Sequence, residues 1–291
     1  MTIECPISQD QMSPLDHSAA KGRLMSVRGE PLLFSDWERA LFIHFDVEPG
    51  RLQAEVPFQL DLRDGKAYVS LVAFTMRRMR PRRGGRLAEW LFKPMATHDL
   101  LNLRTYVRHH GENGIFFLAE WIPNRLSVYL GQRTFGLPYR LARLSYQHCH
   151  DTGSLTGTIE SLPRTIERSG RSLRLEYAGQ LLANPQDRNS FHSCAAGSLD
   201  EFLLERYTAY TQQGSKARFF RVWHPPWRQA KADVRLLDDS LLRRTSAWFE
   251  TAKLVSATYA PGVQDVWMGR PHVVKCDAER HSVLSAFYEM P

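Results

Sequence analysis

The sequence predicts a mainly β fold of the α+β class, in which antiparallel sheets close on themselves and carry a few short helices. Many short segments alternate apolar and polar residues with a period of two, which is typical of strands that have two different faces. Helical patterns are few, and they do not alternate with the strands in the βαβ rhythm of a parallel sheet. Hydrophobic residues make up 43% of the chain and charged residues 24%, as in ordinary globular proteins.

Strand candidates follow one another along the whole chain. The densest alternation lies at residues 101–108, where the loop at 110–114 then reverses the chain into a returning strand at 115–121. A turn at Asp64-Gly65 divides residues 60–76 into a predicted hairpin. The remaining candidates are a strand that follows residues 135–139, and residues 41–47, 146–158, 172–178, 217–222, 232–236, 254–259 and 263–268.

Short helices are predicted where capping patterns precede apolar residues at helical spacing. The clearest one begins at Ser198-Leu199-Asp200-Glu201, a capping box, and is expected to end at Gly214. The other candidates are the capping box at residues 35–38, a single turn at 49–54, an amphipathic segment with Leu87, Trp90 and Leu91, and a helix opened by Pro123-Asn124.

The chain is expected to form an N-terminal arm over residues 1–28 and a single β domain over residues 29–291. The arm is polar and unpatterned, and part of it is expected to be disordered. No apolar signal segment opens the chain and no run of eighteen apolar residues spans a bilayer, so we expect a cytoplasmic protein. The four cysteines are dispersed, and His148-Cys149-His150-Asp151 lacks a third distant ligand, so we expect no metal and no cofactor.

The formal net charge of +7 is concentrated in one stretch. Six arginines between residues 77 and 86 supply six of these charges, so the rest of the chain carries only +1. Pro81 and Gly84-Gly85 predict that this stretch leaves the strand and projects as a loop. Nucleic acid, a membrane surface and an acidic partner are all conceivable for such a run. Because no nucleic-acid-binding motif accompanies it, we expect a solvated loop without a nucleic-acid or membrane partner, or one that folds over a pocket mouth and attracts anions.

Several motifs resemble one protein family. The first two are 102–107, Asn-Leu-Arg-Thr-Tyr-Val, and 136–139, Gly-Leu-Pro-Tyr. Further matching segments lie at 42–45, 64–69, 197–207, 224–227 and 259–267, and all of them occur in the order expected for the family. Together they resemble the YqjF-like family, a domain of unknown function in the acetoacetate decarboxylase-like superfamily. The resemblance implies a β-cone or double-barrel architecture with an interior small-molecule pocket, and it implies no particular reaction.

The resemblance also singles out a turn. Decarboxylases of the superfamily carry a Schiff-base lysine in a Gly-Phe-Pro-Lys-Lys turn, and the matching residues here are Gly136-Leu137-Pro138-Tyr139-Arg140. A phenol and a guanidinium cannot form an imine, so lysine chemistry is not expected at this turn. Lys93, Lys66 and Lys216 are the other candidates, but each lies near a predicted turn.

Four residues are predicted to bind a small organic anion, and two are candidates for proton transfer. Guanidinium groups form bidentate hydrogen bonds with carboxylates, and phenols donate hydrogen bonds to them. The predicted ligand-binding residues are therefore Arg104, Tyr106, Tyr139 and Arg140. Each of these arginines has an alternative structural reading as a rim residue packed over aromatic rings. Glu120 and His224 are the catalytic candidates, although a histidine that caps a strand end would explain His224 equally well.

Two functions remain open at this point. The first is a small-molecule-binding β-barrel that takes a carboxylate or keto acid, with or without enzymatic activity, and lacks the Schiff-base lysine. The second is a non-catalytic ligand sensor or interaction module that uses the same pocket. An enzyme is expected to bury Glu120 or His224 beside the arginines, whereas a sensor needs only an apolar cavity with one anchor. Whether copies of the chain form a homo-oligomer stays open.

Overall fold

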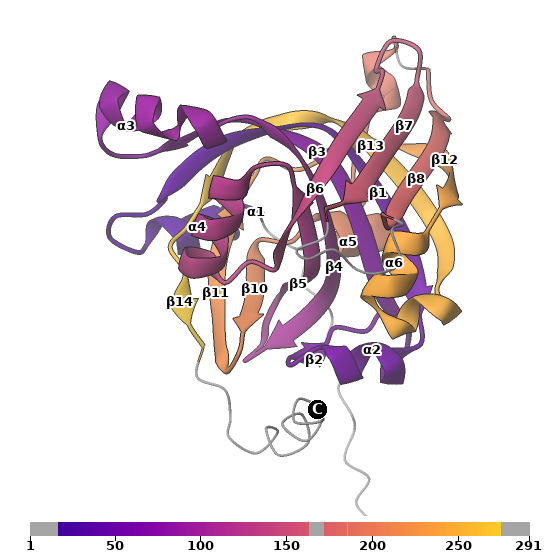
Figure 1. Ribbon diagram of the computed structural model, residues 1–291, viewed down its shortest axis with the longest axis horizontal. Helices are drawn as coiled ribbons and strands as arrows, with labels where there is room; N and C mark the ends of the chain where they lie inside the picture. The colour runs from indigo at the N-terminus through magenta and orange to yellow at the C-terminus, as the bar shows by residue number, and fades with distance from the viewer. Residues whose placement is uncertain (1–16, 163–171, 185, 275–291) are drawn as a thin grey trace, which may run out of the picture.

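A computed structural model describes residues 17–162, 172–184 and 186–274. Fourteen described strands are hydrogen-bonded into one continuous sheet that curls on itself (Figure 1). Nine of them form a closed barrel, because β5 and β4, the first and last strands of the nine, also pair with each other. In order around the barrel these are β5 (Glu112–Ile122), β6 (Tyr139–His148), β7 (Ser154–Ser161), β8 (Arg174–Leu181), β12 (Arg228–Asp238), β13 (Lys253–Met268), β1 (Leu33–Val47), β3 (Ala67–Pro81) and β4 (His98–His109).

A second closed ring of strands shares five strands with the first. β10 (Thr208–Gln213) runs parallel to β5, and β11 (Lys216–Trp223) pairs with β10 and with the far end of β13. The ring therefore passes through β10, β11, β13, β1, β3, β4 and β5. β2 (Gln59–Leu60), β9 (His192–Ser193) and β14 (His272–Val273) are short additions. This is the mainly β, barrel-type fold that the sequence predicts.

The shared strands bury both of their faces. On β3, Val69, Leu71 and Ala73 point into the nine-stranded barrel. Val72, between Leu71 and Ala73, and Phe74, after Ala73, belong to a second buried cluster on the opposite face. The alternation predicted from the sequence thus separates two interiors.

The described helices are short. Asn124 caps α4 (Arg125–Phe135) by accepting a hydrogen bond from the Ser127 amide at 2.9 Å, and Gly136, with a φ of 69°, ends it. The other helices are α1 (His17–Met25), α2 (Pro49–Glu55), α3 (Gly85–Phe92), α5 (Leu199–Leu204), α6 (Ser240–Thr245) and the 3-10 turns η1 (Lys93–Met95), η2 (Arg188–Ser190) and η3 (Ala247–Thr251). No helix in the described ranges has the length and apolar character needed to cross a membrane.

Three predicted elements are wrong. The capping-box pattern at residues 35–38 starts no helix, because β1 begins at Leu33 and pairs with β3 and β13 on its two edges. The arginine stretch does not leave the sheet at Arg77, because β3 continues to Pro81 and absorbs Arg78, at a φ of 49°, as an irregularity. The turn at Asp64-Gly65 is closed by a single bridge from Arg63 to Lys66 and makes no full hairpin, because β2 pairs with β4.

The helix that begins after Ser198 is also shorter than predicted. Ser198 does cap it, accepting from the Glu201 amide at 3.1 Å, but α5 ends at Leu204. The chain then enters β10, which bonds to β5 and β11 in the sheet. At the other end of the chain, residues 1–16 of the predicted arm lie outside the described residues. His17–Met25 forms α1, with Ala20 and Leu24 buried.

Candidate functional site

A cavity of about 620 Å³ lies on the second face of the shared strands, opposite the nine-stranded barrel. It is enclosed by strands β1, β3, β4 and β5 on one side and by α4, β10 and β11 on the other. Most of its wall is apolar. The larger apolar side chains are Leu32, Leu33, Trp37, Phe42, Val72, Phe74, Met76, Met79, Phe92, Met95, Leu100, Ile115, Phe117, Leu130, Phe135, Leu137, Phe220, Val222, Trp227 and Met268.

A row of polar side chains crosses the floor of this cavity. Asn102 on β4 is paired directly with Glu120 on β5, and Glu120 is paired with Tyr139 on β6. Side chains that are paired directly across neighbouring strands lie on the same face and within contact distance. The Asn102 Oδ1 and Glu120 Oε2 atoms are buried and have no hydrogen-bond partner among the described residues. These two atoms are therefore available to a bound molecule.

Glu120 faces the cavity because of a bulge in β5. Phe117 and Glu120 both line the cavity, although strict alternation would place them on opposite faces of a strand. The register between β4 and β5 shifts between Leu103, paired with Ala119, and Arg104, paired with Phe117. Leu118 therefore has no partner on β4. After this bulge, the residues of β5 point to the opposite faces from those that strict alternation would give them.

Arg104 brings a buried positive charge to the cavity wall. Its Nη2 donates to the Leu203 carbonyl oxygen at 3.1 Å, and its guanidinium lies 5.7 Å from the centre of the Phe42 ring. The Nε atom is buried without a partner, and no carboxylate within the described ranges lies at ion-pair distance from this side chain. A buried cation with an unused donor is a strong attractor for an anionic ligand.

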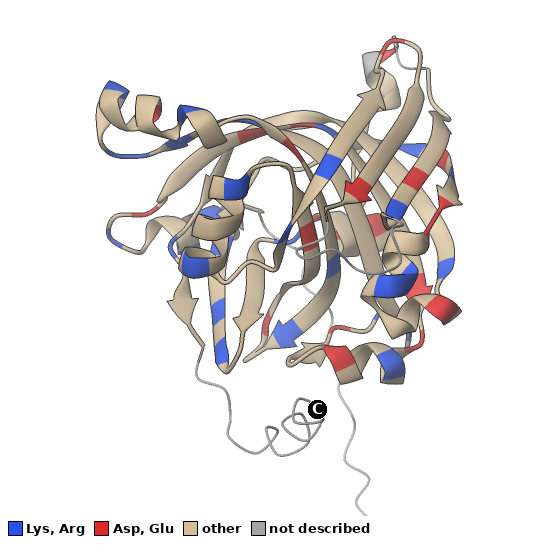
Figure 2. Cartoon of the chain, in the orientation of Figure 1, with Lys and Arg blue, Asp and Glu red and all other residues tan. Residues whose placement is uncertain are grey.

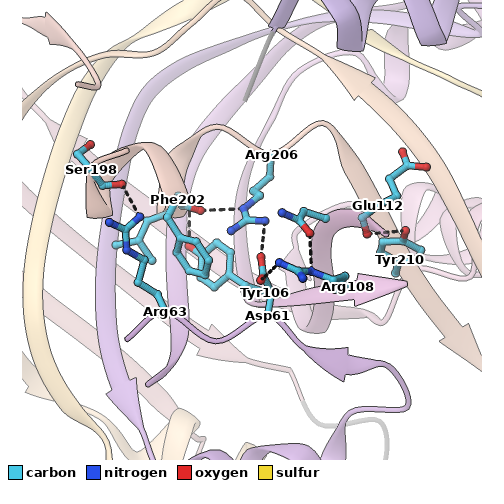
Figure 3. A network of polar contacts seen from close by, with 11 residues as sticks. Asp61, Arg63, Tyr106, Arg108, Glu112, Ser198, Phe202, Arg206 and Tyr210 are labelled. Carbon is cyan, nitrogen blue, oxygen red and sulfur yellow. Dashed lines mark hydrogen bonds and ion pairs between the residues drawn. The ribbon is translucent and has the colours of Figure 1, made fainter. Parts of the chain in front are cut away.

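Arg206 is a second buried guanidinium at the wall, but it is neutralised by the protein itself. Its Nη1 donates to Asp61 at 2.8 Å, its Nε donates to the Phe202 carbonyl oxygen at 2.8 Å, and it stacks 4.2 Å from the Phe202 ring centre (Figure 3). Burial lowers the pKa of Arg206, and Asp61 opposes this shift. Its Nη2 remains unpaired among the described residues, so it has one donor left for a ligand.

The acid and the phenol in the polar row both favour their neutral forms. Burial raises the pKa of Glu120 well above its ordinary value. Burial and then the Glu120 carboxyl raise the pKa of Tyr139 well above its ordinary value. Gly131 makes room for this tyrosine, because a Cβ at residue 131 would lie 2.4 Å from the Tyr139 ring.

His224 lies at the same cavity inside a cage of rings. Its ring centre is 4.9 Å from that of Tyr207, 5.3 Å from that of Trp227 and 6.0 Å from that of Trp37. Its Nδ1 donates to the Pro225 carbonyl oxygen at 2.8 Å, which fixes the tautomer. Burial lowers the pKa of His224 to about 4, so the imidazole is neutral at pH 7.

The structure gathers four of the six predicted site residues and separates two. Arg104, Glu120, Tyr139 and His224 line the cavity, whereas Tyr106 and Arg140 do not. The Tyr106 hydroxyl is used inside the protein, donating to the Leu203 carbonyl oxygen at 2.8 Å and lying 2.6 Å from Ser70 Oγ. The placement of Arg140 in the pocket was wrong, because it follows Tyr139 on β6 and points to the other face. There it lies exposed, 5.6 Å from the Trp121 ring centre and 3.4 Å from Thr245 Oγ1.

Other polar groups of the cavity were not selected from the sequence. They are Asn102, Arg206, His98, Ser127, Thr134, Thr208 and Arg270. Asn102 carries a signal, because it alternates with Arg104 on the same face of a strand. Arg206 carries none, because its burial depends on Asp61, which is far away in the sequence. No group of three or more His, Cys, Asp or Glu side chains within the described ranges could hold a metal ion.

The site can hold an anion and move a proton. The guanidinium of Arg104 and the unpaired donor of Arg206 can bind oxyanion oxygens, and a protonated Glu120 can donate a hydrogen bond or a proton beside them. The apolar remainder of the wall excludes water and strengthens these interactions.

Comparisons with known proteins agree with this architecture. The model of the DUF2071 family, described as an uncharacterized conserved protein, matches residues 35–264. A relative from Bacillus subtilis (strain 168), the uncharacterized protein YqjF, is 28% identical over 207 residues, which cover 69% of this chain and 76% of that protein.

Solved structures are similar at the level of the fold. An acetoacetate decarboxylase-like enzyme from Sphingomonas wittichii RW1 matches with a TM-score of 0.54 and 16% identity, over 85% of this chain and 95% of that chain. The enduracididine biosynthesis enzyme MppR complexed with pyruvate matches with a TM-score of 0.54 and 11% identity, over 86% of this chain and 93% of that chain. With the family model matched over most of its length, the chain belongs to the DUF2071 family and has an acetoacetate decarboxylase-like fold.

Proposed function

We propose that this protein binds an organic carboxylate or keto acid with a sizeable apolar body. The observation that carries the proposal is the buried Arg104 guanidinium, which has an unused donor and no carboxylate partner among the described residues. A buried charge of this kind is costly unless a ligand neutralises it. The carboxylate of the ligand takes that place, with the spare donor of Arg206 beside it.

The size and lining of the cavity define the rest of the ligand. A volume of about 620 Å³ lies within the range of roughly 300–1,000 Å³ that is typical of sites for drug-sized molecules. A three-carbon keto acid such as pyruvate, which is bound in the structure of MppR, would occupy a small part of it. The many leucine, phenylalanine and methionine side chains of the wall favour a ligand whose apolar body is larger.

The polar row supports an enzymatic role without a Schiff base. A neutral Glu120 can act as a general acid toward a carbonyl oxygen of the ligand, and its conjugate base can accept a proton from the carbon beside that carbonyl. Tyr139 occupies the turn position where the superfamily's lysine is expected, and no lysine occurs among the described residues that line the cavity. Lys66, Lys93 and Lys216 are exposed.

A non-catalytic sensor is the second candidate, and the predominantly apolar wall with a buried cation that has no carboxylate partner among the described residues favours it. The two candidates differ in proton transfer. An enzyme that uses Glu120 accelerates deuterium exchange at the carbon next to the carbonyl of a bound keto acid in D₂O, and Glu120→Gln abolishes that exchange while binding persists. A sensor binds the keto acid without accelerating the exchange.

Calorimetric titration with a series of straight-chain acids tests the binding itself. Affinity should rise from pyruvate through 2-oxohexanoate to 2-oxodecanoate, and the matching amides should bind weakly. Arg104→Met should lose at least about 30-fold in affinity, which corresponds to about 2 kcal/mol for a buried charge pair. Arg140→Met is the matched control, because Arg140 is exposed outside the cavity. Equal binding by the two variants, or equal binding of acids and amides, would contradict the proposal.

A chemical test addresses the absent imine. Borohydride treatment in the presence of each keto acid, followed by intact-mass analysis, should give no stable adduct. An adduct on any lysine would show that the Schiff-base part is wrong and would leave the anion site to be judged by the Arg104→Met result.

A further inference from the structure

Helix α3 presents an apolar face to solvent. Leu87, Trp90 and Leu91 lie at positions i, i+3 and i+4, so their side chains share one face of the helix. They are 68%, 67% and 57% exposed, and no residue of α3 is buried. In Figure 1 the helix projects sideways from the strands, at the end of β3. A cluster of large apolar side chains on a projecting helix is typical of an interaction surface.

The same helix begins in a group of exposed arginines. Arg82 and Arg83 precede it and Arg86 lies in its first turn, whereas Glu89 is its single acidic residue. Arg83 and Arg86 make no ion pair with any described residue, and Arg82 donates to the Glu30 carbonyl oxygen. Figure 2 shows the basic segments on α3 and on the chain that leads into it. The surface is therefore both positively charged and apolar.

We propose that α3 docks on an anionic lipid bilayer, with its axis in the plane of the interface. Tryptophan and leucine side chains insert at the boundary between headgroups and acyl chains, and arginines bind the anionic headgroups. A helix in this orientation needs no membrane-spanning length. The sequence predicted no membrane partner, and the exposed face of α3 is the observation that changes this expectation.

Charge favours the bilayer over the other occupants of such a face. In a parallel two-fold pairing of α3 with its copy, Arg83 and Arg86 of one chain would approach those of the other. In an antiparallel pairing they would approach Lys93, which follows the other end of the helix and is exposed. Both arrangements bring like charges together, which costs energy. A nucleic acid would neutralise the arginines but would leave the three large apolar side chains in water. An anionic membrane satisfies both at once.

Docking through α3 also places the candidate site beside the membrane. Phe92, the last residue of α3, and Met95 in η1 both line the cavity. Leu130 and Thr134 of α4 line the cavity and reach the surface, so they mark its mouth. The membrane proposal does not depend on the proposed carboxylate site.

Vesicle co-sedimentation of the full chain tests the proposal. The protein should bind vesicles of phosphatidylglycerol and phosphatidylcholine, bind pure phosphatidylcholine at least tenfold more weakly, and lose binding as salt rises. Trp90→Ser should weaken binding at least tenfold. Arg83→Ala and Arg86→Ala should each weaken it roughly fivefold, because one arginine near such a surface contributes about 1 kcal/mol.

Two matched variants serve as controls. Leu182 is 68% exposed, as Leu87 is, but lies away from α3, so Leu182→Ser should bind as the wild type does whereas Leu87→Ser should not. Arg235→Ala removes one exposed charge on β12 and should also leave binding unchanged. Circular dichroism confirms that each variant is folded.

Three outcomes would overturn the proposal. The first is equal affinity for anionic and neutral vesicles, and the second is vesicle binding that Trp90→Ser leaves intact. The third is a dimer in light scattering that Trp90→Ser converts to monomer in a protein that binds no vesicles, which would assign the face to a second copy of the chain.

Discussion

The two faces of the shared strands have the same backbone but different interiors. On β4, Leu101 and Leu103 point into the nine-stranded barrel and are packed by apolar neighbours on every side. Asn102 and Arg104, the next residues along, point to the opposite face and line a cavity. The first interior is an apolar cluster, and the second holds the unpaired polar atoms of Asn102, Arg104 and Glu120 around an open volume.

One sheet thus serves two purposes in this protein. A filled apolar interior specifies the fold, because each methylene group removed from it costs free energy. The second interior tolerates buried polar groups because the first one supplies the stability.

The largest effect is expected from the two buried arginines of the cavity wall. Arg206→Met leaves Asp61 buried with only the longer 3.4 Å contact to Arg108, so it should cost about 3–5 kcal/mol of unfolding free energy. Arg104→Met removes a cation that has no carboxylate partner within the described ranges, so it should be neutral or stabilising by about 1–2 kcal/mol. Urea unfolding measures both. A large loss of stability in Arg104→Met would contradict the view that this charge is kept for a ligand.

Two adjacent leucines compare the faces directly. Leu101 packs in the filled barrel, whereas Leu100 borders the cavity, and both are buried. Leu101→Ala should cost about 3 kcal/mol and Leu100→Ala clearly less, because a side chain at a cavity wall loses fewer contacts. Calorimetry should show one transition in both variants, because the shared strands join the two rings. Equal losses, or two transitions, would contradict this picture.

Acid should destabilise the cavity side through His224. The folded pKa of about 4 lies below the ordinary value of 6.5, so the unfolded chain binds this proton more readily. The stability is present above pH 6.5 and is lost as the pH falls toward 4, by on the order of 2–3 kcal/mol. His224→Gln should flatten the pH dependence of the melting temperature, and His192→Gln, at an exposed position, is the control. Part of the slope should persist, because burial also lowers the pKa of His44 to about 3.

Glu120→Gln should show the opposite dependence on pH. Burial raises the folded pKa of Glu120, so the folded protein keeps this proton to a higher pH than the unfolded chain does. Wild-type stability should therefore fall as the pH rises from about 4.5 through the raised pKa. The glutamine variant has no such loss, so its advantage in melting temperature should be near zero at pH 4 and grow with pH. An advantage that is independent of pH would show that Glu120 is not held neutral by burial.

Local patterns in the sequence determined much of this protein. Alternation fixes the two faces of β3 and β4, Asn124 and Gly136 bound α4, and Ser198 starts α5, because each of these features depends on neighbouring residues alone. The same patterns place Arg104 and Asn102 on one face of one strand. They also exclude an amine from the turn that ends in Tyr139.

Tertiary pairing decided the rest. The capping box at residues 35–38 yields to two strands that bond β1 on both edges, and the predicted helix after Leu204 yields to β10 because β5 and β11 need a strand there. Arg140 leaves the site because β6 turns alternate residues to opposite faces, and Arg206 enters it because Asp61 neutralises it.

Glu120 shows most clearly what the local sequence pattern cannot predict. Strict alternation from Ile115 would turn Glu120 away from the face that Phe117 lines, and the local sequence gives no sign of the bulge at Leu118. A bulge forms where two strands must stay paired while the sheet bends into a closed ring, so its position depends on the whole barrel. The sequence provides the carboxyl group of Glu120, and the closure of the barrel orients its side chain toward the cavity.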